Sequence, residues 1–244
     1  MKLNTQVNVA THMISTIRSA FSTKTKSLYK WLKRRQNSVN PSPIIILGNQ
    51  KAGTSATTHL LADYGRLSKT VDIPESWWPT LELLLSGDLP LRHFAQDNRD
   101  RFASEVIKEP NLTFFFSELN ELHPRAQFVF VVRDPRSNIR SILNRLDLDG
   151  DRPEIDVGNI PDAWQHLFNR DLWGLHHSHY VALLAERWRK AANVYLNHHE
   201  CIHLIRFEDF LDNKEKSIAE LAAQLSIPCR RDISDLVDVQ YQPR

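Results

Sequence analysis

Residues 43–59, PIIILGNQKAGTSATTH, restrict the fold of this chain more than any other stretch. The apolar run at 44–47 predicts a buried strand, and the pattern at 54–63 predicts a helix. Gly48 and Gly53 bracket the turn between them. A strand, a glycine-containing loop and a helix N-terminus direct main-chain N–H groups at one point, where the helix dipole favours an anion. The stretch therefore predicts a binding site for phosphate or a similar group.

The side chains of this loop do not follow the pattern of a nucleoside-triphosphate loop. That pattern is G-x-x-x-x-G-K-[ST], with the lysine after the second glycine. Here Thr54 follows Gly53, and Lys51 lies two residues before that glycine. Lys51 adds a positive charge on the loop, and Thr54 and Ser55 add hydroxyl donors in the first helical turn. The alternative is an ordinary glycine-containing turn between a strand and a helix, without a ligand.

Composition narrows the class of protein. A length of 244 residues fits one large domain, or one domain with an appendage. Apolar residues at 41% and charged residues at 25% are ordinary for a globular protein, and the net charge is +2. Two cysteines give no disulfide framework and favour a reducing compartment. The sequence shows no apolar run long enough to cross a bilayer and no signal-peptide pattern. We expect a cytoplasmic location.

The first 42 residues differ from the rest. No acidic residue occurs before Asp63, whereas lysine and arginine are frequent in the first 35 positions. Apolar residues between Ala10 and Leu32 recur near helical spacing, which predicts a basic amphipathic helix. Such a helix makes peripheral contact with an anionic membrane, docks on a partner or packs on its own domain; an organelle presequence has a similar composition. We therefore divide the chain into an extension with its linker, 1–42, and an α/β domain, 43–244.

Later segments alternate between strand and helix patterns. Residues 127–132 are apolar on both faces, as expected of a central parallel strand, and a helix is predicted from Pro135 to about Arg145. Further strands are expected at 104–108 and 201–207. This alternation predicts a three-layer α/β/α fold with a central, mostly parallel sheet of four to five strands.

Ligands in such sheets bind at the carboxyl ends of the strands. The Lys51 loop, Lys108 and Arg133 all follow predicted strands, so we expect one crevice to collect all three.

Four segments together resemble the sulfotransferases that use 3′-phosphoadenosine 5′-phosphosulfate (PAPS). Lys51-Ala-Gly-Thr-Ser resembles their 5′-phosphosulfate loop. Arg133 and Ser141 match an arginine and a serine, eight residues apart, that hold the 3′-phosphate. Residues 106–110, VIKEP, and 205–211, IRFEDFL, resemble two further family segments. The four occur in the family's order over residues 43–226, and the chain looks closest to bacterial and glycan-modifying members with a P-loop-like fold.

The resemblance implies PAPS as donor and adenosine 3′,5′-bisphosphate (PAP) as product, without a metal. It assigns Lys51 to the leaving phosphate oxygen and Lys108 to the oxygens of the sulfuryl group. The 3′-phosphate would be held by Arg133 and Ser141. Arg244 resembles the first residue of a late basic loop that closes the cofactor site. The 5′-phosphosulfate would be held by Lys51, Ala52, Gly53, Thr54, Ser55 and Ala56.

The base that removes the acceptor proton is not decided by the sequence. Many cytosolic relatives have a histidine where this chain has Pro110. Glycan-modifying relatives use a glutamate within Glu-x-x-aromatic-aromatic, which Glu75-Ser-Trp-Trp resembles. Glu75 is therefore the first candidate, and Glu109 and His59 are the alternatives. A solvated loop carboxylate is the competing interpretation of Glu75.

We expect a hydroxyl or amine acceptor on a glycan, a lipid or a small metabolite, and no nucleic acid. Two other functions remain open. One is a nucleoside or small-molecule kinase with a degenerate phosphate loop, against which the missing Gly-Lys-Thr/Ser argues. The other is a non-catalytic adaptor or membrane-surface protein that keeps the fold.

Overall fold

The computed structural model describes residues 38–152, 155–177 and 179–241. The amphipathic helix predicted between Ala10 and Leu32 therefore lies outside the described residues. Arg244 also lies outside them. Within the described ranges, no helix is long and apolar enough to cross a membrane.

Five parallel strands form one sheet in the order β2-β3-β1-β4-β5. Strand β1 (Ile44–Gly48) lies at the centre, where Ile45 pairs with Ile107 of β3 on one side and with Phe128 of β4 on the other. From β1 the chain passes to the edge strand β2, returns to β3 beside β1, and then crosses to β4 and β5 on the other side. The connections on the two sides of β1 therefore run in opposite directions, and ligands bind at such a reversal. The predicted fold class is confirmed. The remaining strands are β2 (Lys69–Val71), β3 (Val106–Lys108), β4 (Gln127–Val132) and β5 (Ile202–Arg206).

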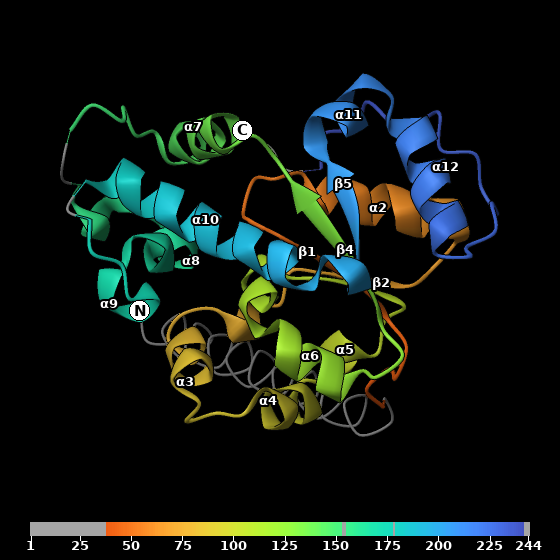
Figure 1. Cartoon of the computed structure of the whole chain (residues 1–244), viewed down its shortest axis with the longest axis horizontal. Helices are drawn as coiled ribbons and strands as arrows, with labels where there is room; N and C mark the ends of the chain where they lie inside the picture. Colours follow the sequence, from red (N-terminus) through yellow and green to blue (C-terminus); the bar gives the residue numbers. More distant parts are fainter. Residues whose placement is uncertain (1–37, 153–154, 178, 242–244) are drawn as a thin grey trace, which may run out of the picture.

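Helices cover both faces of the sheet (Figure 1). Alternate residues of β1 and β4 divide between the two cores. On one face, Ile46 and Val131 pack with α2 (Thr54–Gly65) and α12 (Lys214–Gln224). On the other, Leu47 and Phe130 pack with several helices, among them α4 (Leu91–Asp97), α6 (Phe116–Leu122) and α10 (Tyr180–His198). Both faces of these strands are buried, which explains their continuous apolar sequence.

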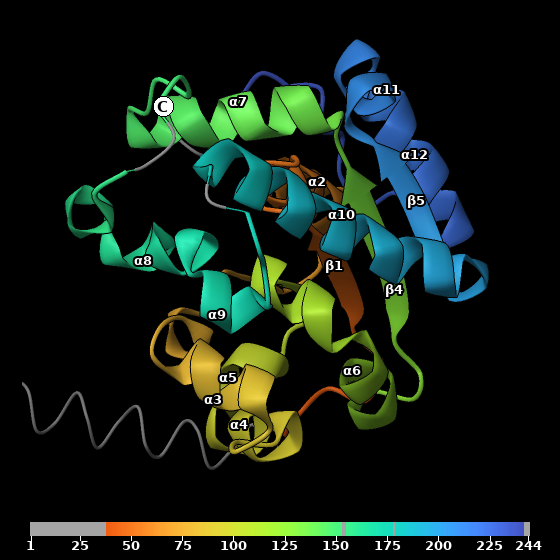
Figure 2. The same ribbon diagram turned by 60° about the vertical axis from the view of Figure 1, so that its left-hand side comes forward.

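A third core lies beyond the strand ends. There α7 (Pro135–Leu146) runs beside α10, and Ile142 and Leu184 are buried between them (Figure 2). The Asp134 side chain caps α7, accepting a hydrogen bond from Ser137 N at 3.1 Å, and Pro135 occupies the first turn. The shorter helices are α3 (Thr80–Ser86), α5 (Arg99–Phe102), α8 (Asp162–Gln165), α9 (Arg170–Trp173) and α11 (Phe207–Asp212). The described residues also form five 3₁₀ turns: η1 (Pro74–Ser76), η2 (Pro110–Phe115), η3 (Val157–Asn159), η4 (His166–Phe168) and η5 (His199–Cys201).

Two parts of the fold were not predicted from the sequence. The three-residue strand β2 at the sheet edge was not predicted, because three residues are too short to show a period. The apolar segment 112–122 does not form one continuous helix, because it is divided between η2 and α6. The 3₁₀ turn begins at Pro110, where the Glu109 side chain accepts a hydrogen bond from Asn111 N.

Candidate functional site

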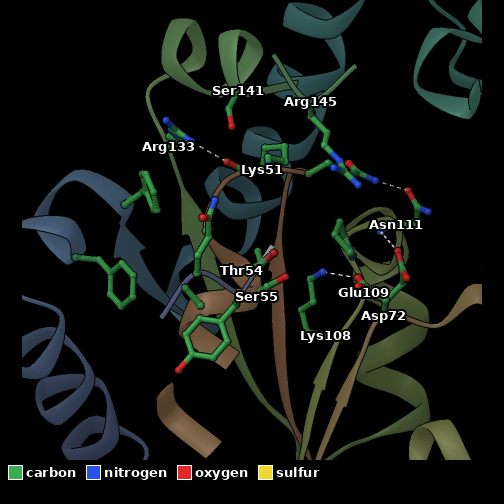
Figure 3. Close-up of a pocket in the computed structure, with 18 of the residues that line it drawn as sticks. Lys51, Thr54, Ser55, Asp72, Lys108, Glu109, Asn111, Arg133, Ser141 and Arg145 are labelled. Carbon is green, nitrogen blue, oxygen red and sulfur yellow. Dashed lines mark hydrogen bonds and ion pairs between the residues drawn. The ribbon is translucent and has the colours of Figure 1, made fainter. Parts of the chain in front are cut away.

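The loop between β1 and α2 requires both of its glycines. Gly48 has φ +141° and Gly53 has φ +103°, backbone conformations that side chains rarely adopt. A Cβ at Gly48 would approach the Val131 carbonyl oxygen at 2.5 Å, and a Cβ at Gly53 would meet the Phe207 ring at 2.3 Å. Without these side chains, the loop backbone can lie against β4 at Gly48 and against α11 at Gly53. The first turn of α2, with Thr54 and Ser55, directly follows this loop and borders the cavity (Figure 3).

Lys51 adopts a left-handed conformation with φ +64°, which is unfavourable for a residue with a Cβ. Surrounding hydrogen bonds hold it there. Asn138 Nδ2 donates to the Gln50 carbonyl at 2.9 Å, and Arg133 Nη1 donates to the Lys51 carbonyl at 3.1 Å. Burial lowers the pKa of Lys51, and the positive charges of Arg145, Arg133 and Lys108 lower this pKa further. An anion bound here would relieve that repulsion.

Arg133 begins the segment after β4, and the Phe207 ring supports its guanidinium at 4.5 Å. This cation–π contact and the bond to Lys51 fix a long side chain in one place. On α7, Ser141 and Arg145 are four residues apart and so lie on one helix face. Both point toward the loop in Figure 3, where Arg133, Ser141 and Lys51 surround one space.

The opposite wall comes from β2, β3 and η2. The Lys108 side chain is almost wholly buried and forms an ion pair with Asp72, which follows β2. Glu109 is buried and accepts hydrogen bonds from Ile73 N at 2.9 Å, Trp77 Nε1 at 3.0 Å and Asn111 N at 3.0 Å. Burial raises the pKa of Glu109, although the Lys108 charge and these donors oppose that shift. The carboxylates of Asp72 and Glu109 thus lie on the wall opposite the Lys51 loop and Arg133.

These walls enclose a cavity of about 730 Å³, within the range of small-molecule and cofactor sites. Most of the predicted site residues line it. They are Lys51, Gly53, Thr54, Ser55, Ala56, Lys108, Arg133 and Ser141. The cavity therefore collects cations from three strand ends and hydroxyl groups from α2 and α7.

The remaining predicted residues lie elsewhere. Ala52 is buried under the loop. Glu75 accepts a bidentate interaction from Arg101, 2.9 Å at its shortest, and is not among the described residues that line the cavity. His59 stacks on the Tyr241 ring with 4.5 Å between ring centroids, and burial lowers its pKa. The Glu75 carboxylate is thus held by Arg101, and its role as the base stays a prediction.

Sequence reasoning missed several lining residues. Asp72 was not selected because the strand before it was not recognised, although the position directly after a strand is the signal that would have found it. Arg145 was also missed, although its position four residues after Ser141 on the predicted helix is a signal that would have found it. The segment 238–241 also lines the cavity, which no pattern indicated. Among the described residues, no group of three or more histidine, cysteine or acidic side chains could hold a metal ion.

The model of the sulfotransferase family matches residues 90–231, which include Lys108, Arg133 and Ser141 but not the Lys51 loop. The comparison with curated proteins finds no match.

Three solved structures are similar in fold. The sulfotransferase domain from the curacin biosynthetic pathway has 17% identity and a TM-score of 0.51, over 78% of this chain and 76% of that one. A sulfotransferase from Alicyclobacillus acidocaldarius has 13% identity and a TM-score of 0.50, over 82% and 87%. Sulfotransferase STF1 from Mycobacterium tuberculosis H37Rv has 11% identity and a TM-score of 0.50, over 87% and 73%. At these identities the likeness concerns the fold alone.

Proposed function

Because this chain belongs to the sulfotransferase family, we propose that it transfers a sulfuryl group from PAPS to a hydroxyl or amine group of its acceptor. The observation that carries the proposal is the pairing of two anion sites in one cavity. The Lys51 loop would form one, and Arg133 with Ser141, which line the same cavity, would form the other. PAPS carries anionic groups at both ends of one adenosine, so it needs two such sites.

The residues present fit this donor. The glycine cradle leaves room that a Cβ would fill, and the cavity volume suits a nucleotide. Main-chain N–H groups at the start of α2 and the hydroxyls of Thr54 and Ser55 would hold the 5′-phosphosulfate. Arg133 and Ser141 would hold the 3′-phosphate. When bound, the donor supplies an activated sulfuryl group whose leaving group is a phosphate oxygen.

Lys51 would stabilise the negative charge that develops on this leaving oxygen. A preorganised donor at such a point contributes about 3–4 kcal/mol to transition-state stabilisation. Lys108 would contact the sulfuryl oxygens; its ion pair with Asp72 keeps the ammonium in place within a buried setting.

The base is proposed anew from the geometry. Asp72 lines the cavity, its side chain is 33% exposed, and it lies beside Lys108. Glu109 also lines the cavity, but three donors occupy its two oxygens. An accessible carboxylate next to the sulfuryl-binding lysine is the better placed proton acceptor, so we assign the role to Asp72.

The acceptor would enter beside Asp72. Trp77, Pro110 and Trp164 line this cavity too and give it flat apolar surfaces. Such surfaces suit a sugar, a lipid or another small metabolite, and the acceptor is proposed only at that level.

Ligand binding tests the proposal. Isothermal titration should show that PAP binds without a metal and that ATP with magnesium does not. Binding of ATP with magnesium alone would support the kinase alternative, and binding of neither would support a non-catalytic protein. Transfer of labelled sulfate from PAPS to a panel of hydroxyl acceptors then tests the reaction itself.

A further inference from the structure

A buried arginine on α10 contacts the site from behind. Arg187 is 1% exposed, and its guanidinium lies against the rings of Phe114 and Trp173 at 4.9 and 4.7 Å. Burial lowers its pKa to about 9, while the nearby Glu109 charge opposes that shift, so Arg187 remains charged at neutral pH. A buried charge is costly unless hydrogen bonds compensate it, which makes its partners informative.

One branch of the guanidinium holds the phosphate loop. Arg187 Nη1 donates to Asn49 Oδ1, Asn49 Nδ2 donates to Asn138 Oδ1 at 2.8 Å, and Asn138 Nδ2 donates to the Gln50 carbonyl at 2.9 Å. Successive hydrogen bonds of this kind polarise one another. This series of hydrogen bonds ends at the carbonyl group directly before Lys51, the residue held in the unfavourable left-handed conformation.

The other branch reaches the opposite wall. Arg187 Nη2 donates to Asn111 Oδ1 at 3.3 Å, and the same oxygen accepts from Gln50 Nε2 at 3.0 Å. Asn111 N in turn donates to Glu109, next to Lys108. One guanidinium therefore connects the Lys51 loop with the segment after β3.

The next residue of α10 contacts the third strand end. Trp188 Nε1 donates to the Arg133 carbonyl at 3.0 Å. Two consecutive side chains of one rigid helix thus bond the elements that carry Lys51, Lys108 and Arg133.

We propose that Arg187 and Trp188 are positioning residues that set the spacing between the two anion sites of the donor. This inference rests on the proposed function, because the spacing matters only for a ligand anionic at both ends. Neither residue touches the donor; each acts through the main chain or through Asn49 and Asn111. Correct spacing is a large part of what a preorganised site contributes.

The test compares Arg187→Met, Arg187→Lys and Trp188→Phe with Arg189→Met, an exposed position on the same helix whose side chain is 67% exposed. Titrations use PAP and adenosine 5′-monophosphate (AMP), which lacks the 3′-phosphate. We expect both Arg187 variants to lose PAP affinity by about tenfold or more, since neither substitute can donate to Asn49 and Asn111 together. We expect Trp188→Phe to weaken PAP binding but not AMP binding, because only Arg133 is displaced.

A role in stability alone would lower the melting temperature while leaving PAP affinity, measured well below that temperature, unchanged. PAP affinity in both Arg187→Lys and Trp188→Phe within about twofold of the Arg189→Met control would overturn the proposal, since lost hydrogen bonds to charged groups cost more than this. If Arg187→Met does not fold, these two conservative variants decide.

Hydrogen exchange separates this proposal from the proposed function. If the wild type does not bind PAP, the proposed function fails. Faster exchange at residues 49–52 in Arg187→Lys than in Arg189→Met would then still support positioning of the loop, and equal exchange would reject it.

Discussion

The guanidinium of Arg133 donates a hydrogen bond to the main-chain carbonyl of Lys51, over 3.1 Å and across 82 positions of sequence. The bond joins the segment after β4 to the loop after β1, so the residues assigned to the two ends of the donor touch one another. Arg133 therefore has two roles, since it binds an anion and also stabilises the conformation of the loop.

Loss of Arg133 should remove selectivity for the 3′-phosphate. In Arg133→Lys, we expect PAP affinity to fall about 10- to 100-fold, because the substitute keeps the charge but not the planar array of donors. AMP affinity should fall much less. Calorimetric titration of both nucleotides measures the ratio. Arg136→Lys, whose side chain is 91% exposed, is the matched control. An unchanged ratio of the two affinities would place the 3′-phosphate elsewhere.

Lys51 should determine the rate and its alkaline limit. Lys51→Ala should reduce kcat by about 10²- to 10³-fold, the usual cost of losing a preorganised donor to a developing anion. Burial and neighbouring cations lower the pKa of Lys51, so the protonated form is lost as pH rises through a value below 10.5. The kcat/KM profile should therefore fall at a lower pH than an ordinary lysine would give. Lys51→Arg should be slower and lack that fall; a retained alkaline limb would assign it to another group.

Asp72 and Glu75 can be distinguished as bases. Asp72→Asn should lower kcat by about 10²- to 10⁴-fold. Glu75→Gln should keep turnover near that of the wild type, because Glu75 is not among the described residues that line the cavity. Steady-state rates of both variants over a range of pH make the comparison. The reverse order of effects would restore Glu75 as the base.

How much of this was predictable depends on the length of each signal. The buried strand at Ile44–Gly48 and the helix at Pro135–Leu146 have enough residues to show their patterns, and both were found at nearly their true bounds. Strand β2 has only three residues, and missing it hid Asp72.

The hydrogen bonds of Arg187 could not be predicted from the sequence, for another reason. An arginine in an amphipathic helix is ordinarily exposed, and Arg189 two positions later fits that expectation. Only the fold places Asn49, Asn111 and Arg187 together, because they come from three distant segments. Patterns in one helix do not reveal such pairings.

Glu109 should make stability depend on pH. Burial raises its pKa above 4.5, so the folded chain binds this proton more tightly than the unfolded chain. Stability should then fall as pH rises from about the unfolded value through the raised one. We expect the unfolding free energy of the wild type, relative to Glu109→Gln, to decrease across that interval in urea titrations. A rising difference for Glu109 would mean that its ionised form is favoured in the folded state.

The close approach of Phe207 to Gly53 should be visible in a comparison of two glycines. Gly53 and Gly87 both have positive φ, +103° and +82°, so alanine is strained at either position. Only at Gly53 does the added Cβ meet another group, the Phe207 ring at 2.3 Å, whereas nothing lies within 4 Å at Gly87. Gly53→Ala should therefore cost about 1–3 kcal/mol more than Gly87→Ala in urea unfolding. Because Phe207 also supports Arg133, Gly53→Ala should weaken PAP binding while Gly87→Ala does not. Equal losses of stability in the two variants would mean that the ring moves aside freely and does not fix the loop.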